Sequence, residues 1–105
     1  MPPLPEPRPA LFLDRDGTVV EDAHFLSDPE QVRLIDGMAE LISTANQAAV
    51  PVCVVTNQSG IDRGLFGWTE FAAVESRIER LLAFEDAAID GLAACPFHPD
   101  FTPDY

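Results

Sequence analysis

Two short apolar runs stand out along this 105-residue chain, because polar residues interrupt each of them abruptly. The first, Ala10 to Leu13, stops at the sequence Asp14-Arg-Asp-Gly-Thr18. The second, Val52 to Val55, stops at Thr56-Asn-Gln-Ser-Gly60. Continuous apolar runs of this length are typical of strands buried on both faces. A third and weaker strand is predicted over about residues 88–95.

Between these runs the apolar residues recur at helical spacing. A first helix is predicted to begin near Gly37, with Asp36 as its N-cap, and to end before Pro51. A second, amphipathic helix is predicted from Thr69, as its cap, to about Phe84. The apolar positions of the two helices are Met38, Leu41, Ile42 and Ala45 in the first, and Phe71, Val74, Ile78, Leu81 and Leu82 in the second.

The alternation of strands and helices predicts an α/β fold. It favours a Rossmann-like, doubly wound parallel sheet with right-handed crossovers. Residues 1–9 are predicted to be a disordered, proline-rich tail, so the domain covers residues 10–105. Residues 19–36 are interpreted as a flap or long loop that could contain one hairpin, and residues 61–68 as a loop.

The chain is strongly acidic, with 18 acids, six arginines, no lysine and a formal net charge of −12. Such a surface repels polyanions, so neither nucleic acid nor an anionic membrane is expected as a partner. Two cysteines make no disulfide framework, and the proline-rich start does not resemble a signal peptide. No apolar stretch approaches the roughly 20 residues of a membrane span. A cytoplasmic protein is therefore expected, and its oligomeric state is left open.

Both polar clusters follow predicted strands, and ligands of open parallel sheets bind beyond the carboxyl ends of the strands. If the strands are neighbours, Asp14 and Asp16 meet Thr56 and the residues after it. Two carboxylates two residues apart lean to the same side in extended backbone, and their repulsion favours a hard cation such as Mg²⁺ between them. One carboxylate could then attack phosphorus while the other shuttles protons.

The remaining polar groups suit phosphate binding. Gly17 would let backbone amides approach a phosphate, Thr56 offers a hydroxyl, and the amides of Asn57 and Gln58 could cradle phosphoryl oxygens. Taken singly, each cluster could equally be a turn or a helix-capping loop. A calcium loop of the EF-hand type is excluded, because Val19 and Phe25 occupy its glycine and glutamate positions.

Phe12-Leu-Asp-Arg-Asp-Gly-Thr-Val19 and Val54-Val-Thr-Asn-Gln-Ser-Gly-Ile61 closely resemble the first two motifs of the haloacid dehalogenase superfamily. The likeness is to the branch of the heptose 1,7-bisphosphate and histidinol-phosphate phosphatases. Shorter matches extend it over residues 10–99: Glu21-Asp22, Asp36-Gly37, Arg63-Gly64 and Cys95-Pro96.

The resemblance implies that Asp14 is a nucleophile that becomes an aspartyl-phosphate, and that Asp16 is the acid and then the base. It implies that Asp14 and the backbone carbonyl of Asp16 bind Mg²⁺, and that Thr56 holds the phosphoryl group. Further candidates for contact with phosphate or substrate are Arg15, Gly17, Asp22, His24, Phe25, Asn57, Gln58 and Ser59. Phe25 stands where an aromatic hydroxyl is commoner in the family, and His24 could equally be an ordinary solvated residue.

Two departures qualify this likeness. Related proteins often bind a structural Zn²⁺, but Phe97 occupies an expected ligand position, so Cys95 and His98 are expected to hold no zinc. The family also requires a downstream cation and a later acidic motif, neither of which appears before Tyr105. A C-terminally truncated phosphatase with only the first three core strands is therefore expected.

The expected activity is hydrolysis of a small sugar phosphate such as heptose 1,7-bisphosphate. Histidinol phosphate or another phosphomonoester is the alternative substrate. A catalytically impaired module that only binds phosphate or Mg²⁺, or that pairs with another chain, is the alternative function.

Overall fold

The computed structural model describes residues 9–22, 26–62 and 64–95. The predictions made for the first eight residues, for His24 and Phe25, and for Phe97 and His98 lie outside these ranges. Within them, no helix is long and apolar enough to cross a lipid bilayer.

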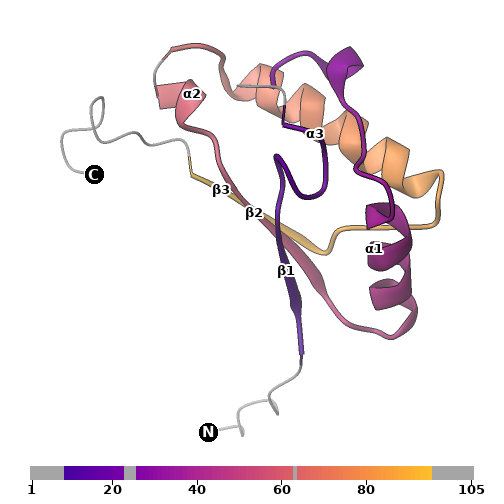
Figure 1. Ribbon diagram of the computed structural model, residues 1–105. Coiled ribbons are helices and arrows are strands. Elements are labelled where there is room, and N and C mark those ends of the chain that lie inside the picture. Colours follow the sequence, from indigo (N-terminus) through magenta and orange to yellow (C-terminus); the bar gives the residue numbers. More distant parts are fainter. Residues whose placement is uncertain (1–8, 23–25, 63, 96–105) are drawn as a thin grey trace, which may run out of the picture.

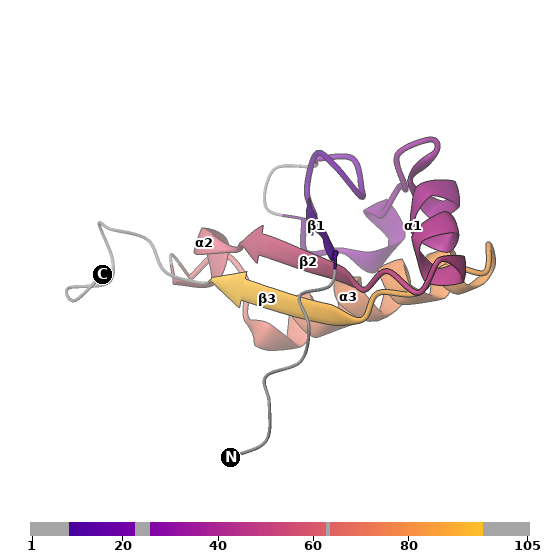
Figure 2. The ribbon, with the colours of Figure 1, turned by 90° about the horizontal axis from the view of Figure 1, so that it is seen from below.

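Three parallel strands form the sheet in the order β1-β2-β3 (Figure 2). The strands are β1 (Leu11–Asp14), β2 (Val52–Asn57) and β3 (Gly91–Cys95). The register places Asp14 beside Val55 and Asn57 beside Cys95, so the carboxyl ends of the strands lie together. The predicted parallel α/β sheet is thus confirmed, although β3 begins at Gly91 and not near residue 88 as expected.

Two helices, α1 (Met38–Gln47) and α3 (Trp68–Ala83), cover one face of this sheet (Figure 1). Their buried side chains pack with those of β2 in a single core. Leu41, predicted to lie on the apolar side of the first helix, is instead 44% exposed. The core residues of these three elements are Ala39, Ile42, Val52, Val54, Val74, Ile78 and Leu82. Of the two helical layers of a doubly wound sheet, the described residues form one.

The ends of the helices differ from the sequence-based expectation. Gly37, not Asp36, is the N-cap of α1, and its φ of +86° suits a residue without Cβ. Helix α3 begins one residue before Thr69 and is capped at Gly67, whose N–H donates to Glu70 Oε2 at 3.0 Å. A short helix, α2 (Ser59–Asp62), overlaps the first two residues of the segment 61–68 that was predicted as a loop. Several neighbouring residues can serve as the N-cap of a helix, so the sequence alone places the cap only to within one or two residues.

The segment interpreted as a flap, residues 19–36, contributes to the core. It contains the short 3₁₀ helix η1 (Pro29–Gln31), and an isolated antiparallel bridge joins Val20 to Leu34. Val19 and Val20 are fully buried, and Leu26 and Val32 nearly so. The segment is thus a long loop, as predicted, but the burial of these four residues packs it into the core beneath the helical layer.

The other face of the sheet is open among the described residues. By the register, Phe12 and Val55 point to this face, and they are 68% and 51% exposed. In addition, β1 has a described neighbour on one side only, so its outer edge is unpaired there. An apolar face and a free parallel edge are sites where further chain adds to a sheet.

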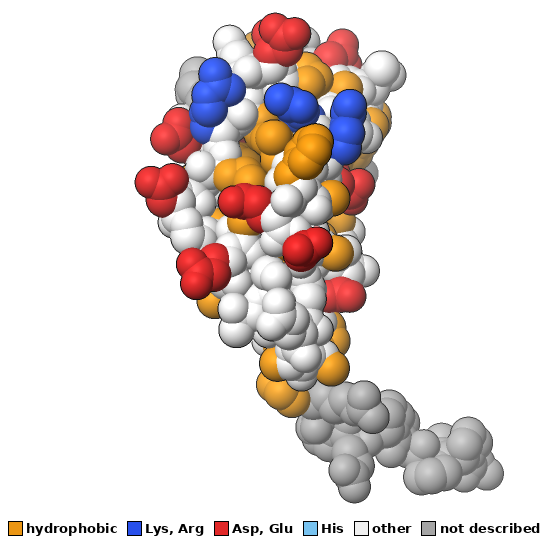
Figure 3. Space-filling view, turned by 90° about the vertical axis from the view of Figure 1, so that its right-hand side faces the viewer, with side chains coloured by type: hydrophobic (Ala, Val, Ile, Leu, Met, Phe, Trp, Pro, Cys, Tyr) orange, Lys and Arg blue, Asp and Glu red, His pale blue; other side chains and the backbone are white. Residues whose placement is uncertain are grey.

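Surface charge is unevenly distributed over the helical side. Figure 3 shows acidic side chains spread across this side and a group of basic ones near one end. The basic group includes Arg33, Arg77 and Arg80, which line a 520 Å³ hollow beside η1. Acidic side chains are thus spread over this side, and the basic ones gather in the arginine group.

Candidate functional site

The chain turns sharply after β1, and this turn carries the first polar cluster. The carbonyl oxygen of Arg15 accepts hydrogen bonds from the N–H groups of Thr18, Val19 and Val20. Gly17 takes a φ of +89°, a conformation that L side chains rarely adopt, and its N–H donates to the carbonyl of Val20 at 2.7 Å. The amide of Gly17 itself is therefore committed to the turn.

Arg15 turns inward from this turn, and its side chain is only 1% exposed. Its Nε donates to Asp16 Oδ1 at 2.8 Å and its Nη2 to Asp16 Oδ2 at 3.2 Å. This two-pronged contact is the geometry in which a guanidinium binds a carboxylate most specifically. The carboxylate of Asp16 is therefore held at a defined place beside the end of β1.

Gln58 joins the two clusters. Its side-chain Nε2 lies 2.9 Å from Asp16 Oδ2 and 2.7 Å from Thr56 Oγ1, and donates to both. Thr56 and Gln58 are buried, at 3% exposure each. Asp16, just after β1, and the hydroxyl of Thr56, near the end of β2, thus share one hydrogen-bond donor. The two polar clusters therefore lie together, as the sequence predicts.

Asp14 ends β1 beside this network with an exposed carboxylate. One oxygen, Oδ1, accepts the N–H of Arg15 at 2.9 Å, and the other accepts no hydrogen bond from the described residues. The carbonyl of Asp16 accepts none of the backbone bonds of this turn. These free oxygens are ligands of the type that Mg²⁺ takes, so the residues fit the predicted metal site. Among described residues, no three His, Cys, Asp or Glu side chains gather as a complete metal cluster.

The other predicted residues are distributed as follows. Asp22 lies beside Gly17, where an added methyl group would stand 3.9 Å from the Asp22 Cβ. Asn57 is exposed at the end of β2, and Ser59 begins α2. The backbone N–H of Gln58 donates to the carbonyl of Cys95 at 2.7 Å, so this amide serves β3 and not a phosphate. Cys95 itself is an exposed free thiol.

Two further residues reach this site from α3, and the sequence reasoning missed their role. Arg15 Nη1 lies 3.4 Å from Glu75 Oε2, and the Arg15 Cζ stands over the ring of Phe71, 5.0 Å from its centroid. Glu75 is 6% exposed and lies four residues after Phe71 and three before Ile78. An acid on an otherwise apolar stripe is the signal that could have revealed it, because buried acids are rare without a partner.

Burial raises the pKa of Glu75 above its ordinary 4.5, because the charged carboxylate loses water, although Arg15 acts in the opposite direction. Glu79 and Asp16 add smaller increases by charge repulsion. The folded chain therefore binds this proton more tightly than the unfolded chain. Protonated Glu75 therefore contributes to the stability of the fold. This contribution is fully present below pH 4.5 and is lost as the pH rises through the raised pKa of Glu75.

We therefore expect the stability difference between the wild type and Glu75→Gln to shift against the wild type as the pH rises above 4.5. Urea unfolding of both proteins between about pH 4 and pH 8 measures this difference. Glu85→Gln, which changes an exposed acid, is the matched control and should give a nearly constant difference. A constant difference for Glu75→Gln would contradict the assigned shift.

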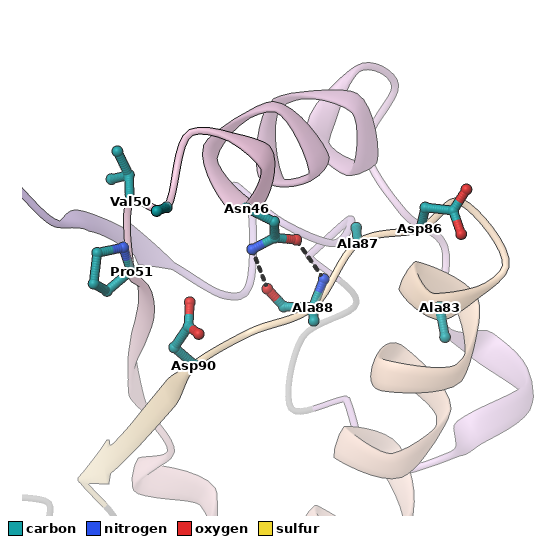
Figure 4. A pocket seen from close by; sticks show the side chains of 9 residues that line it. Asn46, Val50, Pro51, Ala83, Asp86, Ala87, Ala88 and Asp90 are labelled. Carbon is teal, nitrogen blue, oxygen red and sulfur yellow. Dashed lines mark hydrogen bonds between the residues drawn. The ribbon is translucent and has the colours of Figure 1, made fainter.

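A second hollow, of 550 Å³, lies at the opposite ends of the strands (Figure 4). Two of its polar side chains already serve the fold: Asn46 donates to and accepts from the backbone of Ala88, and Asp90 accepts the N–H of Val52 at 2.7 Å. The hollow is lined by Asn46, Ala49, Val50, Pro51, Ala83, Asp86, Ala87, Ala88 and Asp90. These contacts connect α1 to the start of β3, so the chemistry-bearing residues remain those at the carboxyl ends.

Known proteins similar to this chain are phosphatases. A D-glycero-beta-D-manno-heptose-1,7-bisphosphate 7-phosphatase of Mesorhizobium japonicum is 52% identical over 95 residues, which are 90% of this chain and 44% of the relative. The protein of that name from Photorhabdus laumondii is 37% identical over 94 residues, 90% of this chain and 50% of the relative. The chain thus spans about half the length of the curated relatives it matches. No protein-family model matches it.

Solved structures agree with these relatives. A putative HAD-like phosphatase from Mesorhizobium loti is 50% identical, with a TM-score of 0.86 over 92% of this chain and 49% of its own. The D,D-heptose 1,7-bisphosphate phosphatase of B. bronchiseptica, complexed with magnesium and phosphate, is 34% identical, with a TM-score of 0.83 over 89% of this chain and 52% of its own. Over about nine tenths of its length, this chain is therefore similar in sequence and fold to about half of a haloacid dehalogenase-like phosphatase.

Proposed function

We propose that this chain carries the nucleophile-bearing half of a Mg²⁺-dependent phosphatase that acts on a small sugar bisphosphate such as heptose 1,7-bisphosphate. The observation that supports this most directly is the pair of hydrogen bonds from Gln58 Nε2 to Asp16 and Thr56. They bring the acid of the first motif and the hydroxyl of the second to one place, beside the exposed carboxylate of Asp14. The relatives bearing this name supply the substrate class.

In this proposal the reaction has two steps. An oxygen of Asp14 attacks phosphorus, the ester P–O bond breaks, and Asp16 gives its proton to the departing alcohol. Water then attacks the aspartyl-phosphate, Asp16 takes a proton from that water, and orthophosphate and the free Asp14 carboxylate are released. The buried hydroxyl of Thr56 can donate to a phosphoryl oxygen throughout.

Mg²⁺ would be held by the free oxygen of Asp14 and the backbone carbonyl of Asp16. When bound, it neutralises phosphoryl charge, which the arginine in this site is not free to do. Arg15 is buried and already contacts Asp16 and Glu75. The hydroxyl of Thr56, which accepts a hydrogen bond from Gln58 Nε2, would then orient the phosphate as a neutral donor.

One observation favours a second candidate function, binding of phosphate or Mg²⁺ without turnover. Arg15 is the one described cation that contacts the acids of this site, and its charge is shared between two carboxylates. Losing a cationic clamp from a phosphoryl-transfer site costs orders of magnitude in rate. The 105-residue chain could thus bind a phosphate and hydrolyse it very slowly.

The two functions are separated by comparing two proteins with p-nitrophenyl phosphate and with heptose 1,7-bisphosphate, each in the presence of Mg²⁺. One is the chain as it stands, and the other is a chimera that joins it to the part of the Mesorhizobium japonicum relative lying beyond the matched region. We expect turnover from the chimera and little or none from the chain alone. Robust turnover by the chain alone would refute the binding-only function, and an inert, folded chimera would refute the phosphatase proposal.

A further inference from the structure

We propose that Phe71 and Glu75 are positioning residues for Asp16, acting through the guanidinium of Arg15. The inference rests on the proposed function for the role of Asp16, but its structural part does not. Arg15, Phe71 and Glu75 are called the brace below. Two of them come from α3 and one from the turn after β1, 60 residues away from Glu75 in the sequence.

The contacts around Arg15 leave its guanidinium one defined position. The fork of Nε and Nη2 holds Asp16, Nη1 points to Glu75, and the Phe71 ring covers one face of the group. A guanidinium is planar and rigid, so fixing one edge and one face also fixes the edge that holds Asp16. The position of α3 therefore determines the orientation of the Asp16 carboxylate through Arg15. Helix α3 itself packs on the sheet through Val74 and Ile78.

The two acids share Arg15 unequally. The contact to Asp16 is 2.8 Å and the contact to Glu75 is 3.4 Å, so Asp16 is the closer partner. Glu75 Oε1 is buried and accepts no hydrogen bond from described residues, so this acid is bound to the site by Arg15 alone. A buried carboxylate with one unpaired oxygen attracts the Arg15 guanidinium toward α3. Removing the charge of Glu75 should therefore let Arg15 and Asp16 move together.

Asp16 also has a contact that reports its position. Gln58 Nε2 donates to Asp16 Oδ2 at 2.9 Å, so the side-chain NH₂ signals of Gln58 depend on where that oxygen lies. The Nε–H signal of Arg15 reports the other side of the same carboxylate. Both signals can be recorded by ¹⁵N NMR on the 105-residue chain, and neither requires turnover.

The test compares these two signals in the wild type, Glu75→Gln and Glu79→Gln. Glu79 is an exposed acid one turn further along α3, so its variant carries the same charge change without touching Arg15. We expect Glu75→Gln to move both the Arg15 Nε–H and the Gln58 NH₂ signals beyond their line widths, and Glu79→Gln to leave them in place. Unmoved signals in a folded Glu75→Gln protein would overturn the proposal, because a purely structural Glu75 lowers stability without displacing Asp16.

Phe71→Leu is the second variant, and it keeps the test decisive if Glu75→Gln does not fold. It removes the aromatic face over Arg15 and preserves an apolar side chain on the helix stripe. We expect it to move the same two signals, and their constancy would overturn the positioning role of the ring. Because the readout is structural, failure of the phosphatase assay would leave this result intact, and the reverse also holds.

Discussion

Replacing Asp14 with asparagine should lower phosphate release by the chimera by about a thousandfold or more, since the amide is a far poorer nucleophile than the carboxylate. Asp14 is exposed at the end of β1 and has a free carboxylate oxygen, so the substitution removes the attacking atom with little change in packing. The measurement is steady-state release of orthophosphate at saturating Mg²⁺ and substrate. The effect should appear in kcat.

Asp36→Asn is the matched control, because Asp36 is an exposed acid that precedes α1 and caps nothing. It changes the charge by the same amount and should leave kcat nearly unaltered. Retained turnover in the Asp14→Asn chimera would show that another group attacks phosphorus. The assigned nucleophile would then be wrong, even though the fold and family would stand.

Replacing Arg15 with methionine should destabilise the chain by about 3–5 kcal/mol, the usual cost of removing one partner of a buried ion pair. The side chain is 1% exposed and contacts Asp16 and Glu75, so the substitution leaves Glu75 at 6% exposure without its cation. Such a loss is a large part of the stability of an ordinary domain. Urea unfolding at neutral pH measures it as a lower midpoint.

Two further variants show whether the loss comes from the stranded acids. Arg80→Met, at an exposed position of α3, should change the free energy of unfolding little. Adding Glu75→Gln to Arg15→Met should recover part of the lost stability, because the buried side chain is then neutral. An Arg15→Met protein as stable as the wild type, or a double variant less stable than the single one, would contradict the ion-pair account.

The sequence predicted the strands and helices well, because these depend on the pattern of apolar and polar residues over short stretches of chain. Residues 10–13 and 52–55 are apolar runs bounded by polar clusters, and both form strands within one or two residues of the expected bounds. The stripe of Phe71, Val74, Ile78 and Leu82 faces the core as its spacing predicts. Helix caps were less predictable at Gly37 and Gly67, since several neighbouring residues can serve there.

Contacts between distant segments were beyond the reach of such patterns. Val19, Val20, Leu26 and Val32 are buried in one cluster with side chains of α1, β2 and α3, and no periodicity in a loop indicates that. The committed amide of Gln58 likewise depends on β3 lying beside β2. In both cases the deciding partner is tens of residues away.

The order of residue types along the chain was enough to specify three parallel strands, two covering helices, and acids and hydroxyls at the carboxyl ends. Local periodicity and sharp polarity changes encode these features, because they follow from burial and backbone geometry within a few residues. Only the packed molecule decided that Arg15 turns inward, that Glu75 receives it, and that Gln58 joins Asp16 to Thr56. Those choices depend on side chains that lie 42 and 60 positions apart in the sequence, where burial and charge pairing act only after the fold has formed.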